Sequence, residues 1–200
     1  MSLTCISCGI FRFELEKVLP EIKTELDCDV QVEYLDPGLD VHADVLEKAV
    51  SERLRAHADD DTALLYGSMC HTEWPRITEK SGATYPKPAN CAEMLLSPEK
   101  KKEIDARGNV YYLTMGGLKL WKEIYQQGHG WDDADARQNF CYFEKIVVLD
   151  TGVFEIADEE LFEFYEYTQV PVEVEKISLD HFKSVIKSLC EQRRRNRACP

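Results

Sequence analysis

Short apolar segments alternate with amphipathic segments along most of the chain, and this alternation restricts the fold more than any other feature of the sequence. The apolar segments have the length and composition of strands, and the amphipathic segments repeat their apolar residues at helical spacing. We therefore expect an α/β fold with a mainly parallel, Rossmann-like sheet in three layers, with helices on both of its faces. The predicted strands cover residues 3–7, 29–35, 62–67, 110–114, 145–152 and 172–176.

Length and local composition predict the domain organisation. The 200 residues amount to one ordinary domain, and we expect a single α/β domain over residues 1–190. Residues 83–88 form a candidate short strand that its prolines cut off. The last predicted helix covers residues 179–189, and the Arg-rich residues 191–200 are expected to form a basic, flexible tail.

Charge and hydropathy exclude several classes of partner. The formal net charge of −13 repels nucleic-acid phosphates and anionic membrane surfaces. The sequence contains no apolar run of about 18 residues, the length that a membrane span needs. Because its first residues lack a basic segment followed by an apolar one, we expect no secretory leader. We therefore expect a cytoplasmic protein that binds neither nucleic acid nor membrane, and the sequence leaves its oligomeric state open.

Eight cysteines are the chemically unusual residues of this chain. They are too sparse for a small disulfide scaffold, and thiols stay reduced in the cytoplasm. In that compartment, clustered cysteines are more often ligands or catalytic groups than disulfides. Their positions are 5, 8, 28, 70, 91, 141, 190 and 199.

Three of the cysteines follow predicted strands or strand-like segments. Cys8 follows the first strand, Cys70 follows the third, and Cys91 follows the proline-broken segment. Because the carboxyl ends of parallel strands meet at one rim, where such sheets bind ligands, we expect these thiols to lie together. With His71 they make a candidate zinc site, and without it a candidate iron–sulfur site. Cys5 is a weaker candidate, because strand geometry points it away from Cys8.

A buried free cysteine often serves only as a small apolar residue, and this alternative stays open for the candidate ligands. We expect it for Cys28, Cys141 and Cys190, which lie beside apolar residues of predicted helices or strands. Cys199 is expected to be an exposed thiol in the tail.

Turns that contain glycine at the same rim supply candidate ligand contacts. One turn opens a predicted helix, whose free backbone amides can hold an anion or carboxylate. Each turn could equally need glycine for its backbone alone. The candidate residues are Gly9, Gly116, Gly117, Thr151 and Gly152. Residues 128–131 are a candidate lid or a solvated loop, and the chain has no dinucleotide, P-loop, serine-hydrolase or zinc-protease motif.

The order of five short motifs resembles that of domain of unknown function family 1638. The resemblance extends from about residue 3 to residue 190. Family members commonly have Cys-Gly where this chain has Cys70-His71, and Asp-Cys where it has Asn90-Cys91. The first departure could add a histidine ligand, and the second removes a carboxylate beside a thiol. The motifs are ISCGIF at residues 6–11, LYGxxC at 65–70, NCxxxLL at 90–96, YYLTxGG at 111–117 and VLDTG at 148–152.

The resemblance implies a shared site, because members are similar in having one cysteine in each of three segments that correspond to Cys8, Cys70 and Cys91. The family is named for its lack of an assigned function. Many members occur in anaerobes that metabolise methylated compounds, alongside corrinoid methyltransferases. By that association, the resemblance implies a corrinoid as a candidate cofactor, and a corrinoid or methyltransferase protein as a candidate partner.

Three functional hypotheses follow, and they leave open whether the chain is an enzyme. The first is a metal-dependent enzyme or accessory protein of one-carbon metabolism that holds zinc or an iron–sulfur cluster. The second is a metal-free module that binds a small ligand or a corrinoid protein, with the cysteines as packing. The third makes Cys8 a nucleophile with a lowered pKa at a helix N-terminus.

Overall fold

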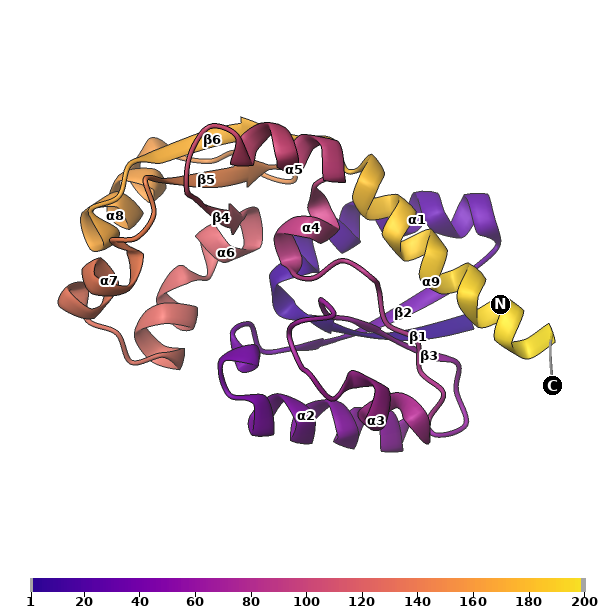
Figure 1. The fold of residues 1–200 in the computed structure, drawn as a ribbon. Helices are drawn as coiled ribbons and strands as arrows, with labels where there is room; N and C mark the ends of the chain where they lie inside the picture. The colour runs from indigo at the N-terminus through magenta and orange to yellow at the C-terminus, as the bar shows by residue number, and fades with distance from the viewer. Residues whose placement is uncertain (1, 199–200) are drawn as a thin grey trace.

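The predicted strands form, and every neighbouring pair is parallel. A computed structural model describes residues 2–198 (Figure 1). Within them the strands form two three-stranded sheets, ordered β2-β1-β3 and β4-β5-β6, with helices against both. The α/β class with parallel strands is therefore confirmed. The strands are β1 (Ser2–Cys8), β2 (Asp29–Leu35), β3 (Thr62–Leu65), β4 (Val110–Thr114), β5 (Lys145–Asp150) and β6 (Val172–Lys176).

The strands divide between two sheets, whereas the sequence favours one. The outer edge of β3 is taken by the residue Thr84, whose backbone exchanges hydrogen bonds with Thr62 and Leu64. This single bridge replaces the short strand expected at residues 83–88, since Pro86 and Pro88 cannot donate to a ladder. The next strand along the chain, β4, belongs to the second sheet.

Helix boundaries agree closely with the local sequence signals. Asn90 and Ser97 cap their helices as the sequence predicts, each accepting a hydrogen bond from a backbone N–H three residues later. The helices are η1 (Gly9–Phe11), α1 (Arg12–Leu26), η2 (Leu39–Val41), α2 (Ala43–Ala56), α3 (Trp74–Glu79), α4 (Cys91–Leu95), α5 (Pro98–Asp105), α6 (Met115–Lys119), the π-helix η3 (Lys122–Gly128), α7 (Asp133–Phe140), α8 (Asp158–Thr168) and α9 (Asp180–Ala198).

The last helix is longer than expected. Helix α9 runs on to Ala198, so residues 191–198, which the sequence assigns to a flexible tail, are helical. Arg and Gln are good helix formers, and no Gly or Pro interrupts this stretch before Pro200. Cys199, predicted to be exposed, lies outside the described residues. Within residues 2–198, no helix combines the length and apolar character that crossing a bilayer requires.

Alternate side chains of each sheet enter different cores. In β5, Ile146 and Val148 pack with α6, α7 and α8, while Val147 and Leu149 point to the opposite face. That opposite face belongs to a core shared with α1, α4, α9 and the first sheet. A third core lies between the other face of the first sheet and helices α2 and α3. The shared core joins the two sheets.

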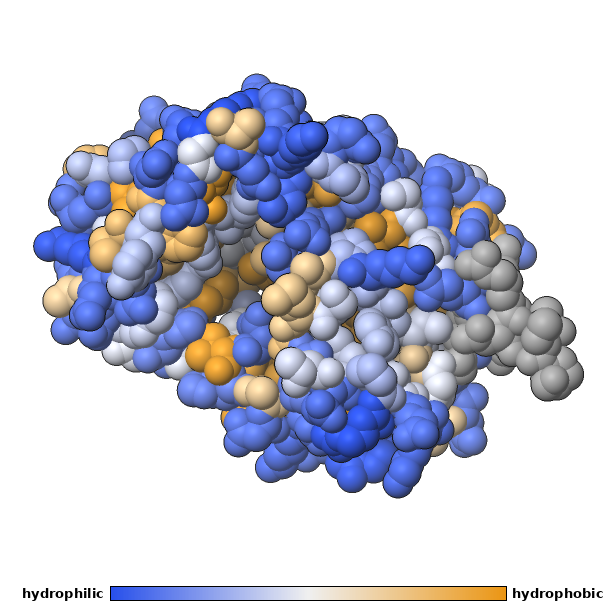
Figure 2. All heavy atoms as spheres, viewed as in Figure 1, coloured by the Kyte–Doolittle hydropathy of each residue, from blue (hydrophilic) through white to orange (hydrophobic). Residues whose placement is uncertain are grey.

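The two sheets also meet at their carboxyl ends. A Cβ added to Gly116, in α6, would lie 1.9 Å from the carbonyl oxygen of Ile10 in η1, so only glycine permits this approach. A Cβ on Gly38, before η2, would lie 3.3 Å from Ile124 in η3. Figure 2 shows a hollow in the surface with both hydrophobic and hydrophilic residues at its edge.

A buried carboxyl group bridges the same junction. Glu14 of α1 is fully buried, and its Oε1 accepts a hydrogen bond of 3.2 Å from the hydroxyl of Thr151, which follows β5. Its Oε2 has no hydrogen-bond partner. Burial raises the pKa of Glu14 to about 7, because the site disfavours the charged carboxylate.

The substitution Glu14→Gln is expected to remove a pH dependence of stability. Folding raises the pKa of Glu14 from 4.5 to about 7, so Glu14 binds more protons in the folded state than in the unfolded state. The free energy of unfolding of the wild type therefore falls as the pH rises from about 4.5 to about 7. The fall in the free energy of unfolding is about 3 kcal/mol, because a shift of one pKa unit corresponds to about 1.4 kcal/mol. Urea unfolding at pH 5 and pH 8 should show this fall in the wild type and a smaller one in Glu14→Gln. Equal falls in both would contradict it, and Glu16→Gln, on the exposed face of α1, is the control.

Gly116→Ala tests the contact between α6 and η1. The new Cβ meets backbone and cannot be relieved by a side-chain rotation, so we expect a loss of about 1–3 kcal/mol in the free energy of unfolding. At Gly117 the nearest atom is a side-chain methyl of Leu113 at 3.0 Å, which can move. Gly117→Ala should therefore be much milder. Chemical denaturation of both variants measures these changes in the free energy of unfolding. Equal losses in the two variants would show that the contact with η1 does not require glycine at residue 116.

Candidate functional site

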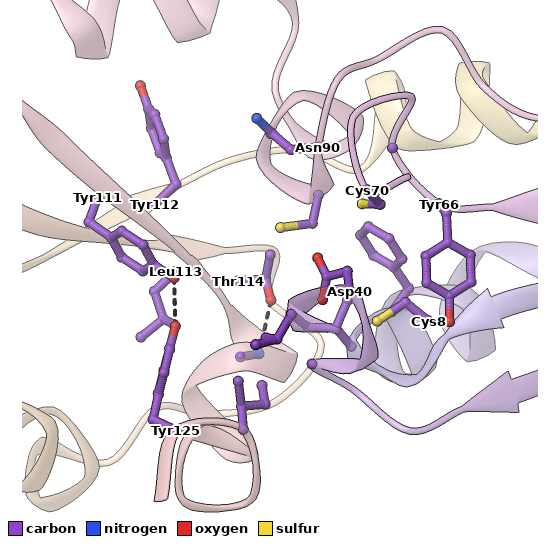
Figure 3. A pocket seen from close by; sticks show the side chains of 18 of the residues that line it. Cys8, Asp40, Tyr66, Cys70, Asn90, Tyr111, Tyr112, Leu113, Thr114 and Tyr125 are labelled. Carbon is purple, nitrogen blue, oxygen red and sulfur yellow. Dashed lines mark hydrogen bonds between the residues drawn. The ribbon is translucent and has the colours of Figure 1, made fainter. Parts of the chain in front are cut away.

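A cavity of about 200 Å³ lies at the carboxyl ends of β1, β3 and β4. Its wall includes residues of both sheets, together with η2, the first residue of α4 and the π-helix η3. Ligands of parallel α/β sheets bind at this end of the strands, and π-helical turns are frequent at functional sites. The cavity is therefore the candidate site (Figure 3).

The three candidate thiols line this one cavity. Cys8 is the last residue of β1, Cys70 lies in the turn after β3, and Cys91 begins α4. All seven described cysteines are free. Parallel strand order alone accounts for the convergence, because each segment leaves its strand toward the same side.

The environment keeps these thiols neutral. Burial, followed by the negative charge of Asp40, raises the pKa of Cys70 to about 12 and that of Cys91 to about 11. The same two causes raise the pKa of Cys8 still further. Nucleophilic cysteines have lowered pKa values instead, so the environment of Cys8 does not favour the nucleophile hypothesis.

Asp40 is a site residue that the sequence interpretation missed. It lies in η2 and lines the cavity, and Figure 3 shows its carboxylate between the sulfur atoms of Cys8 and Cys70. Asp40 is exposed at the mouth of the cavity. Its position five residues beyond β2, another strand of the first sheet, is the signal that could have identified it.

Tyrosines form much of the remaining wall. The hydroxyl oxygens of Tyr111 and Tyr125 lie 2.6 Å apart and share a hydrogen bond. Tyr66 differs, because it is 2% exposed and its hydroxyl has no hydrogen-bond partner. Because the hydroxyl oxygen is itself inaccessible, it does not open into the cavity, and Tyr66 lines the wall with its other atoms.

His71 does not line the cavity. Its Nδ1 accepts a hydrogen bond from the backbone N–H of Glu73 at 3.1 Å, which leaves Nε2 to donate to the carbonyl of Ala43, also at 3.1 Å. The ring packs beside Trp74. With both nitrogens engaged, His71 serves the structure of the loop rather than a ligand.

Cys5 also lies outside the cavity, because strand alternation turns it into the core shared by the two sheets. Cys28 and Cys190 are buried there as expected. Cys141 is exposed at the end of α7, so its expected core position is wrong. The last turn of that helix faces solvent at this residue.

Of the glycine-turn candidates, only Gly117 lines the cavity. Its N–H donates to the hydroxyl of Thr114 at 2.9 Å, so the amide is already satisfied. Gly116 serves the contact with η1, and Thr151 holds Glu14. The other two candidates also lie outside the wall: Gly9 packs beside the carbonyl of Leu35, and Gly152 is exposed next to Lys17.

The donor atoms at the cavity suit a metal ion in kind but not in position. Three thiols and a carboxylate are a suitable donor set for zinc, and zinc–sulfur bonds are near 2.3 Å. Among residues 2–198, however, no three His, Cys, Asp or Glu side chains are placed to hold one ion. The thiols share a cavity without sharing a coordination centre.

Comparison with known proteins identifies a family for this chain but does not identify an activity. A search of curated proteins finds no match. Residues 34–186 match the family described as "Protein of unknown function (DUF1638)", a range that includes Cys70 and Cys91 and begins after Cys8. Because the match covers well over half of the chain, the protein belongs to the DUF1638 family.

Proposed function

We propose that this protein binds a compact small molecule in the cavity between its two sheets. The observation that carries the proposal is the wall of this cavity, which residues of both sheets, η2, α4 and η3 form together and which includes aromatic rings and three thiols. The position at the carboxyl ends of three parallel strands supports the same conclusion.

The volume restricts the ligand. At about 200 Å³, the cavity is smaller than the sites of roughly 300–1,000 Å³ that hold drug-sized molecules. Since one water takes about 30 Å³ in the liquid, a ligand of about seven heavy atoms fits. A corrinoid is far larger than that, so the proposed ligand is not a corrinoid itself.

A thiophilic metal is the second candidate, and one observation favours it. Cys8, Cys70 and Cys91 come from three separate segments and line the same cavity. A zinc ion or an iron–sulfur cluster would be held by these residues after they lost their protons, since metal binding releases thiol protons. The side chains would also have to move together, because their present placement does not suit one ion.

Tyr66→Phe tests whether the buried hydroxyl behind the cavity wall lacks a hydrogen-bond partner. Removing a hydroxyl that has no partner is expected to raise the free energy of unfolding of the unliganded chain by about 1 kcal/mol. Urea unfolding measures this change in the free energy of unfolding. The control is Tyr111→Phe, which removes a hydroxyl that is hydrogen-bonded and should destabilise the chain. A loss of stability in Tyr66→Phe would show that its hydroxyl is already satisfied.

Metal analysis separates the two candidates. The chain, purified without oxygen, is expected to hold zinc and iron only at substoichiometric levels, and a chelator should leave its melting temperature unchanged. The double variant Cys8→Ala and Cys70→Ala should hold as little metal as the wild type, and Cys141→Ala, outside the cavity, is the matched control. Stoichiometric metal that disappears only in the double variant would establish the second candidate instead.

A further inference from the structure

We infer that the ligand of this cavity is a compact organic cation, and that Asp40 selects for its charge. The inference rests on the proposed function and adds the chemical class of the ligand. It follows from the charge of the groups that line the cavity, from their effect on one another and from the aromatic rings among them.

The ionisable groups around the cavity provide no positive charge. None of the described residues that line it is a lysine or arginine, although the chain contains 24 of these residues. His129 is the one basic side chain among them, and burial lowers its pKa, so its ring is neutral at neutral pH. The carboxylate of Asp40 is therefore the dominant charge at the site.

The field of Asp40 extends into the cavity. After burial, its negative charge is the next cause that raises the pKa values of Cys70 and Cys91. It also acts on the hydroxyls of Tyr66 and Tyr125 in the same direction. A field that opposes a new anion at each of these groups favours a cation placed among them.

The neutral groups of the wall fit an organic cation. Carboxylates and aromatic rings are the groups that hold quaternary ammonium ligands in proteins. Tyr66, Tyr111 and Tyr125 supply the rings, and the thiols supply polarizable apolar surface.

Choline and 3,3-dimethylbutan-1-ol provide the test, because they have the same shape and differ in charge. Isothermal titration calorimetry should give tighter binding of choline by the wild type. Asp40→Asn should weaken choline binding about fivefold, since a partly exposed carboxylate contributes about 1 kcal/mol, and leave the neutral alcohol unchanged. Asp44→Asn, an equal change in net charge on the exposed start of α2, is the control and should alter neither.

The outcomes separate this inference from the proposed function. Equal binding of the two probes, or choline binding that Asp40→Asn leaves intact, overturns the cation and leaves a neutral-ligand cavity. Failure of choline to bind also overturns it. Tight Zn²⁺ binding that is lost in Cys8→Ala, without choline binding, assigns the positive charge to a metal. Probe binding that survives Cys91→Phe, which fills the cavity, would place the ligand elsewhere and reject the proposed function as well.

Discussion

The contact between Gly116 and the carbonyl of Ile10 sets the separation of the two sheets. A side chain on residue 116 would overlap backbone at 1.9 Å, so α6 can approach η1 only through glycine. This approach brings the end of β4 next to the end of β1, and the cavity lies between them. The core that α1, α4 and α9 share with both sheets holds the same arrangement from the other side.

Burial at this junction determines the chemistry of the site. It keeps the carboxyl group of Glu14 protonated up to about neutral pH, and it keeps the three thiols neutral. Neutral thiols are neither nucleophiles nor metal ligands until something removes their protons. The cavity is therefore a polarizable, weakly polar compartment with one carboxylate at its mouth, which suits recognition of a small ligand better than covalent chemistry.

Secondary structure and the meeting of the three cysteines could be predicted, because both follow from local patterns and from one general rule. Periodicity identified each strand, and parallel strands bring their carboxyl ends to one side. His71 shows the limit of this reasoning. It adjoins Cys70 in sequence, yet the N–H of Glu73 and the carbonyl of Ala43 engage both of its ring nitrogens.

The sequence by itself determined the α/β class, the order of the strands and the meeting of the three candidate thiols at one rim. Tertiary structure decided that Thr84 pairs with the edge of β3 and that the strands divide between two sheets. It also decided that Asp40 faces the thiols and that Tyr66 keeps a hydroxyl without a partner. The physical reason is range: periodicity and capping act between residues a few positions apart, whereas strand partners, side-chain burial and charge proximity depend on segments far apart in the chain.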